Sequence, residues 1–453
     1  MVQKITEIFE KIQQATGLVG GAAVLIQNGK AETCYFGYSD RETGLPVSEK
    51  TYFDIASCTK SFTAMTAALA VDKGWFDWDT PVQHYLPKFG VADPELSQKI
   101  TVRDLLSHRT GLPRHDFIDH LQIPDRDEVC ARYRYLEATE PYQQAYQYCN
   151  QAYVYFGWVL EHITGRSYEE WLMEDLAKGA GLGIRVRSVP NCMEGLEHAK
   201  PYRTNGKTAC LVEYSMCPSE APDGSVRARL CDLEKWVRMM SAGAQELISK
   251  TQHEQLLKEN IQTAPNGDSY YTMGWRTTRR GGKKLYYHSG DMKGFNAMMG
   301  FLPGEDSGFA VLVNTNGTRA HEIVSEYLMD MLCGTQQADA DSAIAAWQAD
   351  RRQYSARQQQ MEALPYAEGG QLAGTYEHPG YGLCTVTEEA GKTFLQYGVM
   401  RYELRQDDDR LIGYWKSPLV PEDYDVITLK KDGEDLLLNA GESILWLPFK
   451  KQA

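Results

Sequence analysis

The sequence predicts an α+β fold, in which helices flank an antiparallel sheet, an all-helical region is inserted, and a small antiparallel β-barrel ends the chain. Three observations lead to this expectation. A helix and a strand hairpin open the chain, the stretch from about residue 57 to 245 reads as largely helical, and strand patterns return after residue 270. Strands separated from helices in this way are typical of α+β architecture.

The N-terminal segment begins as an amphipathic helix that carries acidic residues. A strand follows at 22–27, then the hairpin dipeptide Asn28-Gly29, and then a return strand that reaches Tyr35. No uninterrupted apolar region opens the chain, and no stretch approaches the roughly 20 apolar residues that span a bilayer. We therefore expect no membrane partner.

The next segment predicts a buried helix that opens at Ser57. Apolar residues recur one turn apart along it, and Gly74 marks its end. Lys60 lies one turn after Ser57, so its amine can reach the serine hydroxyl, and S-x-x-K occurs once in the chain. The helix N-terminus favours developing negative charge. The alternative is that Ser57 is an N-cap and Lys60 a solvated side chain.

A second motif, Tyr148-x-Asn150, stands before a helical stretch that ends near residue 164. A tyrosine that is held among cations can lose its proton and serve as general base and then acid. The asparagine would project from the same side and hold Lys60 or a substrate carbonyl. Because the chain has 27 tyrosines, a buried structural tyrosine is the alternative.

Strands are predicted near 270–277, 284–290, 295–302 and 308–314, followed by a helix at 321–332. The second strand carries a third motif, His288-Ser289-Gly290. The pattern H-x-G also occurs at His378-Pro379-Gly380, so it is informative only because it follows the other two motifs along the chain.

The C-terminal region differs from the rest of the chain in composition. Residues 336–360 are polar and rich in Ala, Gln and Arg, which predicts a linker or an exposed helix. Short strands then recur at near-regular spacing, which predicts a small antiparallel barrel. These strands are expected at 372–377, 384–387, 393–397, 402–405, 410–415, 425–430, 436–439 and 443–448.

The order S-x-x-K, Y-x-N and H-x-G resembles that of the serine penicillin-recognising enzymes. This family comprises class C β-lactamases, D-stereospecific peptidases and related CubicO-like esterases. Further segments match landmarks of the family in the same order, so the resemblance covers roughly residues 5 to 335. They are residues 78–87, 105–113, 165–172, 221–225 and 273–275. The C-terminal part is similar to the lipocalin-like domain that some members carry.

The resemblance implies a role for each motif residue. Ser57 is expected to be the acylated nucleophile, and Lys60 the group that deprotonates it or tunes Tyr148. Tyr148 resembles the general base and acid, and Asn150 the residue that orients Lys60 and the substrate amide. Cys149 stands where serine is common, and a small side chain is the only requirement that we infer there.

The strand motif departs from the class C pattern. There the triplet is usually Lys-Thr-Gly, whereas His288 is mostly neutral at pH 7 and supplies less charge. This departure favours the D-aminopeptidase, D-peptidase and esterase branches. Ser289 and Gly290 are expected along the substrate, and the backbone N–H groups of Ser57 and Asp291 are expected to form the oxyanion hole.

Composition limits the partners and the compartment. The net charge of −14 argues against nucleic acid as a partner. The ten cysteines form no C-x-x-C pair, which suits free thiols in the cytoplasm. No metal-ligand spacing, phosphate-binding loop or G-x-S-x-G elbow is present in the sequence, so we expect no metal and no cofactor.

We therefore predict a serine hydrolase domain at 1–335, a linker at 336–365 and a barrel at 366–453 that supplies no catalytic group. The expected activity is acyl-serine hydrolysis of small amides or esters, of a D-stereospecific peptidase or amidase type, on a small-molecule or short-peptide substrate. The alternatives are a carboxylesterase, a weak β-lactamase or a non-catalytic ligand sensor. Homo-oligomer formation is left open.

Overall fold

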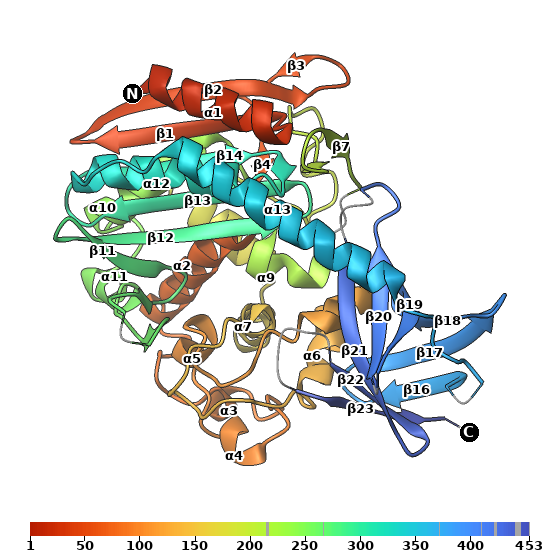
Figure 1. Ribbon diagram of the computed structural model, residues 1–453. Helices are drawn as coiled ribbons and strands as arrows, with labels where there is room; N and C mark the ends of the chain where they lie inside the picture. The colour runs from red at the N-terminus through yellow and green to blue at the C-terminus, as the bar shows by residue number, and fades with distance from the viewer. Residues whose placement is uncertain are drawn as a thin grey trace.

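The computed structural model describes residues 1–213, 217–265, 267–370, 372–408, 410–420, 424–439 and 445–452. Its centre is a nine-stranded sheet in which all neighbouring strands pair antiparallel (Figure 1). From edge to edge the strands are β3 (Leu45–Pro46), β2 (Lys30–Asp40), β1 (Gly20–Gln27), β14 (Ser307–Val313), β13 (Phe295–Leu302), β12 (Lys283–Met292), β11 (Arg276–Arg280), β10 (Tyr270–Tyr271) and β9 (Ile261–Gln262). The predicted antiparallel sheet is confirmed, although the strand expected at 270–277 is divided between β10 and β11.

Helices cover both faces of this sheet because its central strands are apolar on both sides. Along β13, Met298 and Leu302 face a core shared with α1 (Val2–Thr16) and α12 (Ala320–Cys333). The alternate residues Ala297, Met299 and Phe301 face the opposite core, which includes α2 (Thr59–Asp72) and α10 (Leu230–Ala242). This period of two places the helix that carries Lys60 directly against the sheet.

The helical region lies below the sheet in Figure 1. Its helical elements are η1 (Ala56–Cys58), α3 (Val82–Tyr85), α4 (Pro94–Ser97), α5 (Val102–Leu106), η2 (Asp116–Leu121), α6 (Arg126–Tyr133), α7 (Asn150–Thr164), α8 (Tyr168–Glu170), η3 (Trp171–Ala177), η4 (Pro218–Glu220), α9 (Ala221–Gly224) and, by the sheet edge, α11 (Lys250–Leu256). Two small three-stranded sheets interrupt this part. They are β4-β8-β5 (Phe53–Asp54, Val226–Ala228, Arg185–Val186) and β15-β6-β7 (Thr315–Asn316, Tyr202–Thr204, Ala209–Leu211).

The C-terminal region forms a helix and a closed eight-stranded barrel. Of the two expectations for residues 336–360, the helix is the one observed, because α13 spans Ala340–Ala363. The barrel strands are β16 (Gly374–His378), β17 (Gly382–Glu389), β18 (Lys392–Tyr397), β19 (Met400–Asp407), β20 (Arg410–Lys416), β21 (Tyr424–Asp432), β22 (Asp435–Asn439) and β23 (Leu447–Lys451). The strand expected at 443–448 begins outside the described residues, since 440–444 are not among them.

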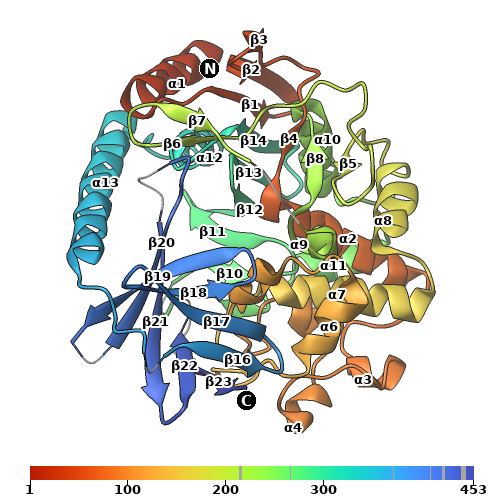
Figure 2. The same cartoon turned by 90° about the vertical axis from the view of Figure 1, so that its right-hand side faces the viewer.

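The barrel docks on η2 and the residue before it, within the helical region. Tyr397 stacks on Phe117 with ring centroids 4.0 Å apart, and the Val399 N–H donates to the His120 carbonyl at 2.9 Å. The Tyr381 hydroxyl bonds His115 Nδ1. Figure 2 shows the barrel next to α6, below α13. The barrel therefore contacts residues next to the site described below.

Candidate active site

Ser57 lies in the short helix η1, immediately before α2. Every residue of α2 from Thr59 to Ala70 is buried, whereas Ser57 itself is partly exposed. The residue before it, Ala56, has a φ of +47°, which is rare for a side chain with a Cβ. The serine is thus presented from a strained turn on a fully packed helix.

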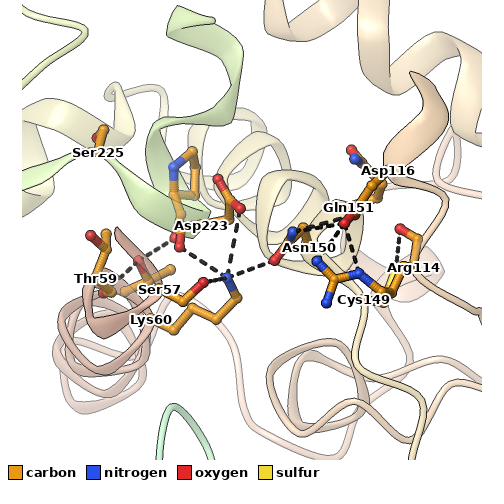
Figure 3. A network of polar contacts seen from close by, with 12 residues as sticks. Ser57, Thr59, Lys60, Arg114, Asp116, Cys149, Asn150, Gln151, Asp223 and Ser225 are labelled. Carbon is orange, nitrogen blue, oxygen red and sulfur yellow. Dashed lines mark hydrogen bonds and ion pairs between the residues drawn. The ribbon is translucent and has the colours of Figure 1, made fainter. Parts of the chain in front are cut away.

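The Lys60 ammonium is the centre of the polar network in Figure 3. Its Nζ lies 3.1 Å from Ser57 Oγ, donates to Asn150 Oδ1 at 2.8 Å and donates to the Asp223 carbonyl at 2.9 Å. The Asp223 carboxylate is 3.6 Å away, and the Lys60 side chain is 0% exposed. The alternative of a solvated Lys60 is therefore wrong.

Asn150 is the first residue of α7 and its amide orientation follows from its partners. Its Oδ1 accepts from Lys60, so its Nδ2 faces Asp116 at 3.3 and 3.4 Å. Asp116 is in turn paired with Arg114. Two charged side chains that the sequence analysis did not select, Arg114 and Asp116, therefore hold this asparagine.

Tyr148 lies beside the same ammonium, with Lys60 Nζ 5.1 Å from its ring centroid. Two arginines flank the ring as well, Arg114 at 5.3 Å and Arg276 at 5.7 Å. Within the described residues the Tyr148 hydroxyl has no hydrogen bond to Ser57 or Lys60. Catalytic hydrogen bonds often tighten only when the substrate is bound.

Arg276 brings a positive charge to the rings around Tyr148, although the strand motif itself has no lysine. It opens β11, it is partly buried, and its guanidinium lies 5.4 to 5.7 Å from the centroids of Tyr146, Tyr148 and Tyr271. No carboxylate among the described residues pairs with it. Arg276 was not selected from the sequence. The signal that could have identified it is its position directly after the landmark at 273–275.

The strand motif fixes the backbone of β12 against η1. A Cβ at Gly290 would lie 2.1 Å from the Ile55 carbonyl oxygen, so only glycine allows this approach. The Cys58 thiol donates to the His288 carbonyl at 3.3 Å. The Asp291 carboxylate accepts from Asn296 and Asn316. Its backbone follows Gly290 directly, on the part of β12 that lies against η1.

The His288 side chain lies beneath the site, with only 1% of the residue exposed. Its Nδ1–H donates to the Ser289 carbonyl at 2.7 Å, so Nε2 accepts from the Tyr271 hydroxyl at 2.9 Å. Burial, assisted by the charges of Arg276 and Lys60, holds the pKa of His288 well below its usual range. This neutral imidazole therefore orients Tyr271.

Four carboxylates gather on the other side of Lys60: Asp116, Asp119, Glu220 and Asp223. Burial raises the pKa of Asp223 to about 6, against the opposing effect of the Lys60 charge. Burial and neighbouring carboxylates raise the pKa values of Asp119 and Glu220 well above the usual range. Asp223 belongs to the landmark at 221–225, but no role was predicted for it.

Cys149 is buried and inert. Burial raises the pKa of its thiol to about 12, and its Sγ faces the Arg114 carbonyl at 3.8 Å. The Cys149 N–H donates to Nδ1 of the buried His108 at 3.1 Å. A small side chain fits this position, and His108 holds the turn that carries Tyr148.

Other site types find no support in the part of the chain that the structure describes. No group of His, Cys, Asp and Glu there has the geometry to hold a metal ion. None of the described helices is long and apolar enough to cross a bilayer. All ten cysteines are free thiols.

Comparison with known proteins gives a family match over most of the chain. The model of the family described as Beta-lactamase matches residues 5–330. An unguisins hydrolase, ungD', from Aspergillus campestris is 25% identical over 384 residues, which cover 77% of this chain and 71% of that protein. Protein flp from Staphylococcus aureus is 22% identical over 71% of this chain, and the match spans 65% of its own length.

Solved structures with the same fold include an octameric penicillin-binding protein homologue from Pyrococcus abyssi. Its TM-score is 0.66 at 20% identity, with 99% of this chain and 98% of that chain covered. SurE matches with a TM-score of 0.63 at 20% identity and covers 99% of both chains. A D-stereospecific amidohydrolase from Streptomyces matches with a TM-score of 0.61 at 20% identity, over 74% of this chain and 100% of its own.

Proposed function

Because the chain belongs to the Beta-lactamase family, we propose that it is a serine hydrolase that forms an acyl-serine intermediate. The observation that carries this proposal is the position of the Lys60 ammonium, 3.1 Å from Ser57 Oγ and completely buried. A buried lysine beside a partly exposed serine is the arrangement that an activated nucleophile requires. A silent binding protein has no chemical need for it.

In the proposed acylation step, Ser57 Oγ attacks the carbonyl carbon of the substrate. Its proton passes to the Tyr148 oxygen, while Lys60, itself positioned by Asn150, holds the serine in place. The three cations around the tyrosine ring compensate the negative charge that this residue carries as a base. His288 does not contact the substrate, and it acts indirectly by orienting the Tyr271 hydroxyl.

The tetrahedral intermediate then needs hydrogen-bond donors for its oxyanion. We assign these to the backbone N–H groups of Ser57 and Asp291, because Gly290 allows β12 to lie against η1. Ser289 lies along the substrate. When the intermediate collapses, the amine or alkoxide that leaves takes the proton from Tyr148. A water molecule then attacks the acyl-serine with Tyr148 as base, and Ser57 is restored.

The substrate class that we propose is a small amide with a D-residue or a short peptide of that kind. The absence of a lysine from the strand motif and the neutral state of His288 favour this class over β-lactams. A structural neighbour is described as a D-stereospecific amidohydrolase, and a relative as a hydrolase of unguisins. A carboxylesterase or a weak β-lactamase is the alternative within the same chemistry.

A substrate panel tests this proposal. D- and L-aminoacyl amides, short p-nitrophenyl esters and β-lactams are offered to the wild type and to Ser57→Ala. We expect turnover of the D-amides or esters, slow β-lactam hydrolysis, and a loss on the order of 10⁴-fold or more in the variant. Full activity of Ser57→Ala ends the proposal, and efficient cephalosporin turnover would place the protein with the β-lactamases instead.

We also propose the cytoplasm as its location, because all ten cysteines are free and most are buried. The division into a domain at 1–335, a connecting segment at 336–365 and a barrel domain at 366–453 is proposed as well. One structural neighbour is described as octameric, so light scattering is the appropriate measurement of oligomeric state.

A further inference from the structure

The carboxylates beside Lys60 exceed the cations available to them. Asp116 is neutralised by Arg114, and Asp223 has the Lys60 ammonium 3.6 Å away. Glu220 and Asp119 have no cationic partner among the described residues, and the only side chain that donates to Asp119 is the neutral amide of Gln151. The cluster therefore holds more carboxyl groups than cations.

One oxygen of Asp223 is particularly informative. The residue is 9% exposed, and its Oδ1 is buried without any hydrogen-bond partner. A buried carboxylate oxygen that accepts no hydrogen bond is destabilised by the full desolvation penalty of its burial. Figure 3 shows the Asp223 carboxylate next to Lys60 and Ser57, with Asp116 beyond Asn150. An incoming donor would satisfy this oxygen at the point where an acyl group meets the serine.

The chemistry of the missing donor follows from its surroundings. Burial and mutual repulsion raise the pKa values of Glu220, Asp119 and Asp223, so a bound positive charge is favoured there. A metal ion does not fit, because no group of described residues has metal-holding geometry. A primary ammonium matches this chemistry, since it carries a positive charge and has three N–H groups that donate to separate acceptors.

We propose that Glu220 and Asp223 hold the protonated amine of the acyl part of the substrate, with Asp116 beside them. The inference rests on the proposed acyl-serine function, and it narrows the substrate class to aminoacyl donors with a free amine. Lys60 connects the two regions, because it contacts Ser57 Oγ on one side and Asp223 on the other. An acyl group on Ser57 therefore presents its amine to these carboxylates.

A matched pair of substrates tests the inference: D-alanine p-nitroanilide and its N-acetyl derivative, at pH 7. We expect kcat/KM to be about 10- to 100-fold higher for the free amine, and Glu220→Gln to reduce this ratio at least about 5-fold. Glu246→Gln, which changes an exposed carboxylate on the loop after α10, keeps the wild-type ratio. A ratio of one or below in the wild type, or a ratio that Glu220→Gln leaves unchanged, overturns the inference.

A second readout works even where the anilides are not cleaved. D-Alaninamide is expected to protect Ser57 from labelling by a fluorophosphonate at lower concentration than N-acetyl-D-alaninamide does, and Glu220→Gln should remove the difference. If Ser57 is labelled but the two amides protect equally, the ammonium site is refuted and the serine hydrolase stands. If Ser57 is not labelled at all, the proposed function fails first.

Discussion

The two halves of the active site are supported in different ways. Lys60 belongs to α2, which is buried from Thr59 to Ala70, and Ser57 belongs to the short helix η1 before it, which lies against β12 of the central sheet. Tyr148 and Asn150 depend on a polar layer, in which Arg114 and Asp116 contact them from an irregular segment. That segment is in turn held by the barrel, through the bond between Tyr381 and His115.

This difference connects the barrel to Tyr148, the proposed base, although none of the barrel residues that the structure describes is labelled in the network of Figure 3. His115 lies between Arg114 and Asp116 and has a φ of +55°. Burial lowers the pKa of its ring to about 4, so Nε2–H donates to the Glu137 carbonyl while Nδ1 accepts from Tyr381. Substitutions near β12 should therefore displace Ser57, and substitutions in the barrel should displace Tyr148.

The largest effect is expected from Gly290→Ala, which disturbs the packing around Ser57 and Lys60. The added Cβ meets the Ile55 carbonyl oxygen at 2.1 Å and the Ala56 Cβ at 3.1 Å, so β12 or η1 must move. We expect kcat/KM to fall about a hundredfold and the free energy of unfolding to fall by about 1–3 kcal/mol. Steady-state kinetics measures kcat/KM, and urea denaturation measures the free energy of unfolding.

Gly90→Ala is the matched control, because the nearest atom to its added Cβ is 3.4 Å away. Its activity should stay within about twofold of the wild type, as ordinary contacts are preserved. Wild-type activity in Gly290→Ala would mean that the close contact between β12 and η1 is not needed for catalysis.

Tyr381→Phe is expected to have a smaller effect, on the base half. It leaves Nδ1 of the buried His115 without its donor, which costs about 1–3 kcal/mol and loosens the Arg114–Asp116 segment. We expect kcat to fall about tenfold with little change in KM, because the base is misplaced while substrate contacts remain.

Tyr402→Phe serves as its control within the same barrel. The Tyr402 hydroxyl donates to Asp425 at 2.7 Å, and both residues belong to the barrel. This variant should lose stability but keep kcat. Equal kcat values in the two variants would contradict the proposed connection between barrel and base.

The last effect concerns stability rather than activity, and it involves pH and the carboxylate next to Lys60. Because the pKa of Asp223 is raised to about 6 from an ordinary value near 4, the folded protein binds more protons than the unfolded chain between these pH values. Its contribution to the free energy of unfolding therefore falls as pH rises from about 4 to 6, by an amount on the order of 3 kcal/mol. Asp223→Asn should remove this slope.

The buried histidines act with the opposite sign, so the difference between wild type and variant is the quantity to measure. Burial holds the pKa values of His108 and His288 well below their usual range, so their contribution to stability is lost as pH falls below about 6.5. Urea denaturation from pH 4 to 8 gives both curves. Parallel curves for wild type and Asp223→Asn would show that this carboxylate is not perturbed.

Many of the strands could be predicted from the sequence, because they follow from the local alternation of apolar and polar residues. The strand periods at 295–302 and 308–314 reappear as β13 and β14 within one residue, and the barrel strands follow their predicted spacing. The short strands β4 to β8 were missed in the helical middle, since two or three residues carry no period and form only through tertiary pairing. The helix α13 was one of two open expectations.

Ser57 and Lys60 lie together because a spacing of three at a helix start fixes them locally, whereas Asn150 meets Lys60 across 90 residues and was predicted there from the resemblance. Their partners could not be found in this way. Asp223, Arg276 and Arg114 come from distant parts of the chain, and only the folded structure brings them to Lys60 and Tyr148. The link from Tyr381 to His115 spans 266 residues and left no local signal.

The most direct test of the central claim is intact-mass analysis after incubation with a fluorophosphonate probe. The wild type should gain the mass of one probe, mapped by peptide sequencing to Ser57, and Ser57→Ala should gain none. Lys60→Ala should label far more slowly than the wild type, because the serine loses the ammonium that lies 3.1 Å from its hydroxyl. An unlabelled wild type with folded circular dichroism, or a label of equal extent in Ser57→Ala, would contradict the assignment of Ser57 as the nucleophile.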